Sequence, residues 1–264
     1  MNPRGYLVLD IETVPDPLLY VPPETVAGQE RPFPPIYVHR PIVIGVLWLD
    51  DEYNFQRIGC IGENKDELGM LGDFAAFADA YRPHLVTYNG RSFDLPVIAL
   101  RCLRHGVPLR FFFQDKEYRY RFSDQGHIDL YDFLSEHGAA RVGSLDAIAR
   151  VIGLPGKVGV DGSQVEGLYN GGQLDLIKRY CLTDVAQTAF LFLRYRLLQG
   201  VLDVPGYQRA ASGLLSALEA DGRVQPVLER IDRTRLLLTN FAAPAEPTTP
   251  PAPPTTTPPV TPST

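Results

Sequence analysis

The order of apolar and polar residues predicts strands in the first part of the chain. Residues 6–12 form a Leu- and Val-rich run that ends in polar side chains, a pattern typical of a buried strand. Similar short runs at 42–49, 55–61 and 84–88 are interpreted as three further strands. Residues 67–81 carry apolar side chains at helical spacing and are expected to form an amphipathic helix.

Helical patterns dominate the rest of the chain. The expected helices lie at 95–105, 130–137, 145–152, 173–198 and 207–220. Strands with one crossover helix, followed by a run of helices, are typical of an α/β domain in which a mixed β-sheet is flanked by helices. We expect one such domain, over residues 1–241.

Two proline-rich segments interrupt these patterns. The stretch from Pro15 to Pro41 is too irregular for a helix and long enough to suggest a functional loop. Residues 242–264 are almost wholly Pro, Thr, Ala and Ser, and they cannot bury enough apolar surface to offset the entropy lost on ordering. We expect a disordered or extended tail. A passive tail is the preferred interpretation, and recruitment of an SH3-like partner by its Pro-x-x-Pro spacing is the alternative.

Composition limits the class of protein. Of the 264 residues, 45% are hydrophobic, enough for one sizeable core. No apolar run is long enough to predict a membrane-spanning helix, and the N-terminus lacks the apolar core of a signal peptide. Cys60, Cys102 and Cys181 are too widely spaced to suggest a zinc site or a disulfide framework. We therefore expect a cytoplasmic protein with reduced thiols and no membrane partner.

The formal net charge of −6 disfavours tight, sequence-independent binding to a long nucleic-acid duplex. A cluster of metal-binding carboxylates would account for part of this acidity, and bound cations would reverse its local sign. Basic residues also cluster at 101–105 and 116–121, although an ordinary solvated surface explains such clusters equally well. Charge therefore leaves a nucleic-acid partner open.

The first of three acidic blocks ends the first expected strand. Asp10 and Glu12 point to the same face, because side chains alternate along a strand. Two carboxylates at a strand end form a platform of hard oxygen ligands suited to Mg²⁺ or Mn²⁺. Taken alone, Asp-x-Glu is common and also has a purely structural explanation.

The second and third blocks lie at expected helices. Asp94 closes the segment 88–94 and begins a helix, where a carboxylate also stabilises the helix by capping and by its charge. Asn89, in the turn of that segment, is expected at the exposed end of a strand. Tyr180 and Asp184 share one helix face, so the carboxylate is placed to hold a metal while the phenol reaches a water. A packed tyrosine beside an exposed aspartate is the alternative.

The three blocks together indicate a known chemistry. Two divalent ions held about 3.5–4 Å apart by acidic side chains suit phosphodiester cleavage. Asp-x-Glu, Tyr-Asn-Gly-x-x-Phe-Asp and Tyr-x-x-x-Asp resemble the exonuclease motifs of the DEDD superfamily of 3′–5′ exonucleases, most nearly those of the proofreading domain of family B DNA polymerases. Residues 126–130 and 144–149 resemble the segment between that domain's second and third motifs. The resemblance runs from about residue 5 to residue 194, and no polymerase region follows in this sequence, so we expect a stand-alone family B-like exonuclease.

This resemblance implies a ribonuclease H-like fold, two Mg²⁺ or Mn²⁺ ions, and release of nucleoside 5′-monophosphates from a 3′ end. The family's four metal ligands match, by position, Asp10, Glu12, Asp94 and Asp184. Tyr180 matches the residue that orients or deprotonates the attacking water, and a phenol with an ordinary pKa of about 10 is better suited to orienting it. Asn89 and Phe93 match positions that touch the terminal nucleotide. Arg179 stands where the histidine branch of the family has its base, so the chain resembles the tyrosine type.

Other polar residues have simpler explanations. Asp129 follows His127 at the start of a strand or helix and is expected to support the site indirectly or to cap the helix. The glycine-rich segment 153–159 lacks the lysine–hydroxyl pair of a phosphate-binding loop, although a turn that carries Lys157 towards a substrate phosphate remains an alternative.

The leading hypothesis is a metal-dependent 3′–5′ exonuclease acting on single-stranded DNA or frayed 3′ ends, with a base stacked on an aromatic such as Phe93. An exoribonuclease is the alternative within the same class, because no residue visibly tests for a 2′-hydroxyl. A catalytically silent module that holds 3′ ends would be expected to lack a metal ligand, and none of the four is missing. A scaffold that acts through the proline-rich tail is the third class.

Overall fold

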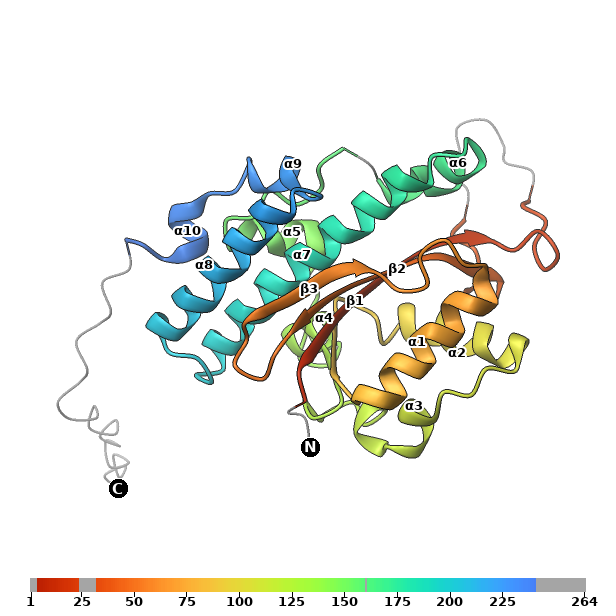
Figure 1. The fold of residues 1–264 in the computed structure, drawn as a ribbon, viewed down its shortest axis with the longest axis horizontal. Coiled ribbons are helices and arrows are strands. Elements are labelled where there is room, and N and C mark those ends of the chain that lie inside the picture. The colour runs from red at the N-terminus through yellow and green to blue at the C-terminus, as the bar shows by residue number, and fades with distance from the viewer. Residues whose placement is uncertain (1–3, 24–31, 160, 241–264) are drawn as a thin grey trace, which may run out of the picture.

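A five-stranded sheet separates two helical layers (Figure 1). The computed structural model describes residues 4–23, 32–159 and 161–240, so the expected tail at 242–264 lies outside the described residues. The strands are β1 (Tyr6–Pro15), β2 (His39–Leu49), β3 (Phe55–Cys60), β4 (His84–Thr87) and β5 (His127–Asp129). The helices are α1 (Glu67–Tyr81), α2 (Asp94–His105), α3 (Arg110–Gln114), α4 (Leu130–Leu134), α5 (Leu145–Val151), α6 (Val165–Asn170), α7 (Leu174–Leu198), α8 (Val204–Asp221), α9 (Gln225–Leu228) and α10 (Arg233–Leu237).

The sheet is mixed, as the sequence predicted, with strand order β3-β2-β1-β4-β5. The hairpin strands β1, β2 and β3 pair antiparallel, whereas β4 joins β1, and β5 joins β4, in parallel. The parallel pairing brings the C-terminal ends of β1, β4 and β5 to the same edge region of the sheet. Loops that follow parallel strands are common places for ligands to bind.

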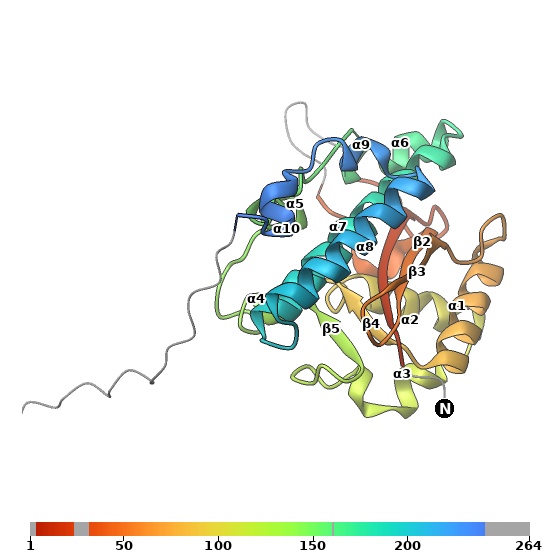
Figure 2. The same ribbon diagram turned by 60° about the vertical axis from the view of Figure 1, so that its left-hand side comes forward.

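The alternation of side chains along β1 builds a core on each face of the sheet. Val8 belongs to a buried cluster with residues of α7 and α8, among them Phe190. Leu7 and Leu9 belong to a second cluster with residues of α1 and α2, among them Phe74. Figure 2 shows α7 and α8 crossing one face of the sheet, with α1 and α2 on the other side. The even-numbered residues of β1 therefore face α7, and the odd-numbered residues from Leu7 to Ile11 face α1 and α2.

The connection expected from Pro15 to Pro41 is shorter than the sequence suggested. β1 runs to Pro15 and β2 begins at His39, so both prolines lie in strands. Pro41 pairs with Thr13, where the register of the β1–β2 ladder shifts just after Glu12. A proline cannot donate to the ladder and is tolerated at such an irregularity. The remaining connection includes residues 24–31, which lie outside the described residues.

The other expected elements are confirmed within one to three residues at their ends. The helix expected at 130–137 ends earlier, at Leu134, because Glu136 and His137 both take a left-handed backbone conformation. The short helices α3, α6, α9 and α10 were not expected. They have four to six residues each, too few to show a helical period.

The three cysteines are free thiols, in agreement with the sequence. Among the helices of the described residues, none combines the length and apolar character that crossing a membrane requires.

Candidate active site

The central strand β1 presents two acids to α7. Asp10 is half-buried and Glu12 is 8% exposed. They lie two and four residues after Val8 and therefore point to the same face of the sheet as Val8, whose side chain packs in the α7–α8 cluster. Ile11, between them, is buried in the opposite cluster. The strand therefore places the two carboxylates side by side at one end of the sheet, as the sequence predicted.

A glycine in β2 lets α7 approach these acids. Gly45 pairs with Asp10 across the β1–β2 ladder. A Cβ atom at Gly45 would lie 2.5 Å from Sγ of Cys181, so any larger residue would push α7 away. The Cys181 thiol is 3.5 Å from both the main-chain oxygen and Oδ2 of Asp10, to which it donates. This close contact brings Tyr180 and Asp184, on the same helix, to the end of β1.

Asp94 reaches the same place from α2. It is 5% exposed, and its Oδ1 accepts a hydrogen bond of 3.1 Å from the main-chain N–H of Ile11. The carboxylate is therefore tied to β1 at the residue between Asp10 and Glu12. The N-cap position of α2 is Phe93, which makes no side-chain capping bond. Asp94 contacts the strand that bears the other acids, which capping alone does not explain.

The turn before Asp94 depends on small residues. Asn89 has φ of 65°, in the left-handed region that asparagine tolerates better than most residues. A Cβ atom at Gly90 would lie 2.6 Å from two atoms of the Thr87 side chain. The tight turn carries the chain from the last residue of β4 directly into α2.

Burial and mutual repulsion make the charged forms of the four acids costly. Burial raises the pKa of Asp94 to about 7 and that of Asp184 to about 6. It also raises the pKa of Asp10 and of Glu12 well above the usual range, and the charges of Asp94 and Asp184 add to this effect at both residues. A cluster of this kind gains stability when cations neutralise it.

Tyr180 presents a protonated phenol to the cluster. Its hydroxyl lies beside the carboxylate of Asp184, one helical turn away. Burial first, and then the charge of Asp184, raises the pKa of the Tyr180 phenol far above its usual value. The hydroxyl therefore remains protonated at neutral pH.

Oxygen atoms are the donors that this cluster offers to a metal. Within the described part of the chain, ligand atoms of Asp10, Glu12 and Cys181 all lie within 4.8 Å of one another. Burial raises the pKa of the Cys181 thiol well above its usual value, so the sulfur stays protonated and is a poor ligand. The carboxylates of Asp10 and Glu12 are hard oxygen donors, the kind that Mg²⁺ and Mn²⁺ prefer, and the charges of Asp94 and Asp184 act on both.

A cavity of about 200 Å³ opens beside these acids. Its lining residues are Asp10, Tyr88, Ser144, Leu145, Asp146, Lys157, Tyr180, Asp184 and Gln187. Gln187 follows Asp184 by three residues on α7, and this spacing alone could have placed it in the site. Tyr88 and the segment 144–146 belong to stretches that already resembled the family in the sequence, but only folding brings them to α7.

The glycine-rich turn carries Lys157 into this cavity. The main-chain N–H of Gly156 donates to Oε1 of Gln187 at 2.9 Å, and that of Lys157 donates to Oδ1 of Asp146 at 2.6 Å. The ammonium group of Lys157 pairs with Asp161 at 2.6 Å. Its positive charge also lowers the pKa of Glu12 and of Asp184, against the stronger effect of burial. The turn thus supplies a cation at the rim of the acidic cluster.

The two residues matched to substrate contacts lie in the loop between β4 and α2, just before Asp94. Phe93 packs edge-on against His39, with ring centroids 5.0 Å apart, and against Phe33 at 5.7 Å. Phe33 is 73% exposed, so this aromatic group presents an open ring surface. Asn89 is half-buried, and its main-chain N–H donates to Asp129. The sequence motifs include Asn89 and Phe93 but not Phe33 or His39, whose packing on Phe93 is a tertiary contact.

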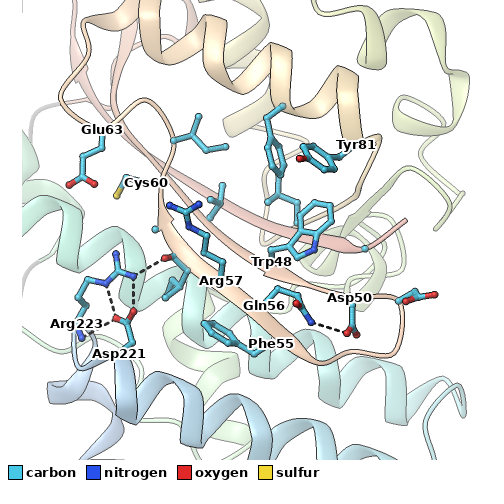
Figure 3. Close-up of a pocket in the computed structure, with 18 of the residues that line it drawn as sticks. Trp48, Asp50, Phe55, Gln56, Arg57, Cys60, Glu63, Tyr81, Asp221 and Arg223 are labelled. Carbon is cyan, nitrogen blue, oxygen red and sulfur yellow. Dashed lines mark hydrogen bonds and ion pairs between the residues drawn. The ribbon is translucent and has the colours of Figure 1, made fainter. Parts of the chain in front are cut away.

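A larger cavity, of about 1090 Å³, lies on the opposite face of the sheet (Figure 3). It runs between α1 and the β2–β3 hairpin, and its apolar wall includes Trp48, Phe77 and Tyr81. Arg223 closes one side, where it pairs with Asp221 and donates to the main-chain oxygen of Ile58 at 2.7 Å. It contains none of the acids predicted from the sequence, so the smaller cavity is the candidate site.

Comparison with known proteins agrees with the motifs and the fold. Residues 31–231 match the model of a family described as predicted 3′–5′ exonuclease related to the exonuclease domain of PolB. The catalytic polypeptide of DNA polymerase epsilon from Schizosaccharomyces pombe is 27% identical over 135 residues, which cover 49% of this chain and 6% of that protein. The family B DNA polymerase of the hyperthermophilic archaeon Pyrobaculum calidifontis superposes with a TM-score of 0.53 at 23% identity, over 86% of this chain and 27% of that chain.

The structural likeness establishes the fold as ribonuclease H-like. The chain spans only a small part of these relatives, so their activities as whole proteins do not transfer to it. The family model, in contrast, covers most of the described residues, including the second and third sequence blocks, and it confirms the family resemblance. The first block, with Asp10 and Glu12, precedes the matched residues. The chain belongs to the family of 3′–5′ exonucleases related to the exonuclease domain of PolB.

Proposed function

We propose that this chain is a metal-dependent exonuclease that removes nucleotides from the 3′ end of single-stranded or frayed DNA and releases nucleoside 5′-monophosphates. The observation that carries the proposal is the convergence of three sequence-distant blocks on one acidic cluster. Asp94 accepts a hydrogen bond from the strand that holds Asp10 and Glu12, and Tyr180 lies beside Asp184 on α7. We assign the activity to a domain formed by residues 1–241.

Two Mg²⁺ or Mn²⁺ ions are proposed as cofactors. The donor atoms support this proposal, because they are carboxylate oxygens. Burial and the neighbouring acids destabilise the charged carboxylates, and a bound cation would neutralise them. When bound, such ions lower the pKa of a water molecule and stabilise negative charge on the leaving oxygen. The residues that would hold them are Asp10, Glu12, Asp94 and Asp184.

The protein's own groups position the reaction. Water attacks the terminal phosphorus, the bond from phosphorus to the 3′ oxygen breaks, and that oxygen leaves with a proton as the new 3′-hydroxyl. Because the pKa of Tyr180 is raised, its hydroxyl is a donor rather than a base, and it orients the water. Asn89 and Phe93 are proposed to bind the terminal nucleotide, with the open ring surface of Phe33 available for stacking of a base.

DNA is preferred over RNA as the substrate because the relatives of this chain include DNA polymerases. The same carboxylates would hydrolyse either backbone, so an exoribonuclease is the second candidate. A module that binds 3′ ends without cleaving them is disfavoured, since all four acids and Tyr180 are present at one site.

The direct test is digestion of matched single strands of DNA and RNA labelled at the 5′ end, with Mg²⁺, Mn²⁺ or chelator. We expect a ladder of labelled products that shorten from the 3′ end, on DNA faster than on RNA, and none with chelator. Asp10→Ala should abolish the ladder. Asp73→Ala, which removes an acid paired with Lys65 on an exposed surface, should not. Cleavage that survives chelation, or immediate release of a labelled mononucleotide, would overturn the proposal.

A further inference from the structure

The edge strand β5 ends in a buried carboxylate that binds the loop bearing Asp94. Asp129 is 1% exposed and lies beside Thr87, its partner in the parallel β4–β5 ladder. Its Oδ1 accepts from the main-chain N–H of Asn89 and its Oδ2 from that of Arg91, each at 2.8 Å. The carboxylate thus spans the start of the six-residue turn that separates β4 from α2.

Helix capping accounts for only part of these contacts. Asp129 is the N-cap residue of α4, where Oδ1 also accepts from Tyr131 at 3.1 Å and from Asp132 at 3.4 Å. α4 is five residues long and uses a single oxygen of the carboxylate. The other oxygen binds Arg91, about forty residues earlier in the chain, which a cap would not require.

The side chain of Arg91 makes the return contact. Its guanidinium donates to the main-chain oxygen of His127 at 3.3 Å and to that of Arg119 at 3.4 Å. Strand β5 therefore holds the backbone of the loop through Asp129, while the loop holds the backbone of β5 through Arg91. The two contacts form a reciprocal clasp.

The clasp acts on the two residues of the loop that matter to the proposed site. Asn89 takes the left-handed conformation in which its N–H points at Asp129, and a residue in that conformation persists only where its surroundings fix it. Further along, Leu95 N–H donates to Gly90 O at 2.9 Å, which couples the turn directly to the first turn of α2 and hence to Asp94.

We propose that Asp129 and Arg91 are positioning residues, which hold the β4–α2 loop so that Asp94 and Asn89 meet the metal and the terminal nucleotide. This inference rests on the proposed function. Where a residue does not bind the metal itself but orients the metal's ligands, its replacement lowers metal affinity or activity by about 10- to 100-fold. We expect an effect of that size here.

The test compares Asp129→Asn with Asp203→Asn. Both aspartates cap a helix through a main-chain N–H, because Asp203 accepts from Gly206 at 2.7 Å, but only Asp129 also binds the loop. In Asp129→Asn one oxygen becomes an NH₂ group, which cannot accept from the two sides of the turn. We expect faster hydrogen exchange at Asn89 and Arg91, Mn²⁺ affinity reduced by about tenfold in calorimetry, and a lower kcat on single-stranded DNA. Asp203→Asn should change only the melting temperature.

Arg91→Met provides a second route should Asp129→Asn fail to fold. It removes the return contact and keeps the main-chain N–H that Asp129 binds, so the same changes are expected at smaller size. Unchanged exchange at Asn89 together with unchanged Mn²⁺ affinity, in whichever variant folds, would show that the clasp is structural only. Failure of the proposed function would look different, because the wild-type chain itself would then not degrade DNA.

Discussion

The hydroxyl of Tyr180 lies beside the carboxylate of Asp184, one turn further along α7, and both line the same cavity. This contact keeps a proton next to the acidic cluster and lowers the pKa of Asp184 against the stronger opposite effect of burial. Tyr180 is thus placed beside a proposed metal ligand without being one. The two residues should differ in what they contribute to catalysis.

Tyr180→Phe tests the role of the hydroxyl, because it keeps the ring and its packing. We expect kcat to fall by roughly 10²- to 10⁴-fold, the range typical of a positioned proton-transfer group, with substrate KM and metal affinity little changed. Asp184→Asn should weaken both metal binding and catalysis, since a neutral amide is a poorer ligand for a hard cation. Steady-state kinetics and metal titration of the two variants provide the measurement. Should Tyr180→Phe retain wild-type kcat, the phenol serves only packing.

The raised pKa of Asp94 makes the stability of the metal-free protein depend on pH. An aspartate in the unfolded chain has a pKa of about 3.9, against about 7 in the fold. The proton is held more tightly by the folded state, so the stability it contributes is present below pH 4 and is lost as pH rises through 7. Asp94→Asn stays neutral and can still accept from Ile11, so it should be more stable than wild type at pH 8, on the order of 1–3 kcal/mol. Urea unfolding at pH 4 and pH 8 with chelator measures the difference, and an equal effect at both values would contradict the argument.

Metal binding should reverse this instability. Cations neutralise the acids in the folded state only, so Mg²⁺ or Mn²⁺ should raise the melting temperature, and chelator should lower it again. The shift should diminish as pH falls below about 6, because protonation of Asp184 and Asp94 competes with metal. Glu12→Gln serves as the control in which the shift is reduced at every pH. Absence of any shift at millimolar metal would refute the two-metal proposal.

The residues proposed for this site could be selected from the sequence because they lie on regular elements. The period of a strand puts Asp10 and Glu12 on one face, and the period of a helix does the same for Tyr180 and Asp184. Neither period shows which loops of the fold contact these residues or their neighbours. The partnership of Asp129 with Asn89 joins residues forty positions apart in the chain, so it could not be read from local spacing.

The close approach of α7 to β2 could not be predicted from the sequence either. That Gly45 admits Cys181 follows from the close packing of α7 on β2, which no local pattern records. The strand extensions to Pro15 and from His39 were missed because proline normally ends a strand, whereas here the shift in register beside Pro41 accommodates it. The sequence could suggest which residues form the proposed site, but the contacts that support them required the structure.

Those supports include a buried ion pair network that ties the end of β1 to two helices. Arg101, on α2, is 2% exposed and binds Asp16 at 2.9 Å and Glu67 at 2.8 Å. Asp16 directly follows the strand that bears Asp10, and Glu67 begins α1. The network therefore fixes the relative positions of the strand and of the helix that carries Asp94.

Arg101→Met should lower the free energy of unfolding by about 3–5 kcal/mol, because it leaves two largely buried carboxylates without their main cation. Lys65→Met is the matched control, since it breaks an ion pair with Asp73 of which both partners are about half exposed, and such pairs contribute roughly 0–1 kcal/mol. Urea unfolding at pH 7 measures both variants. A loss in Arg101→Met no larger than in the control would mean that His105, which lies 3.1 Å from Glu67, together with solvent, replaces the arginine.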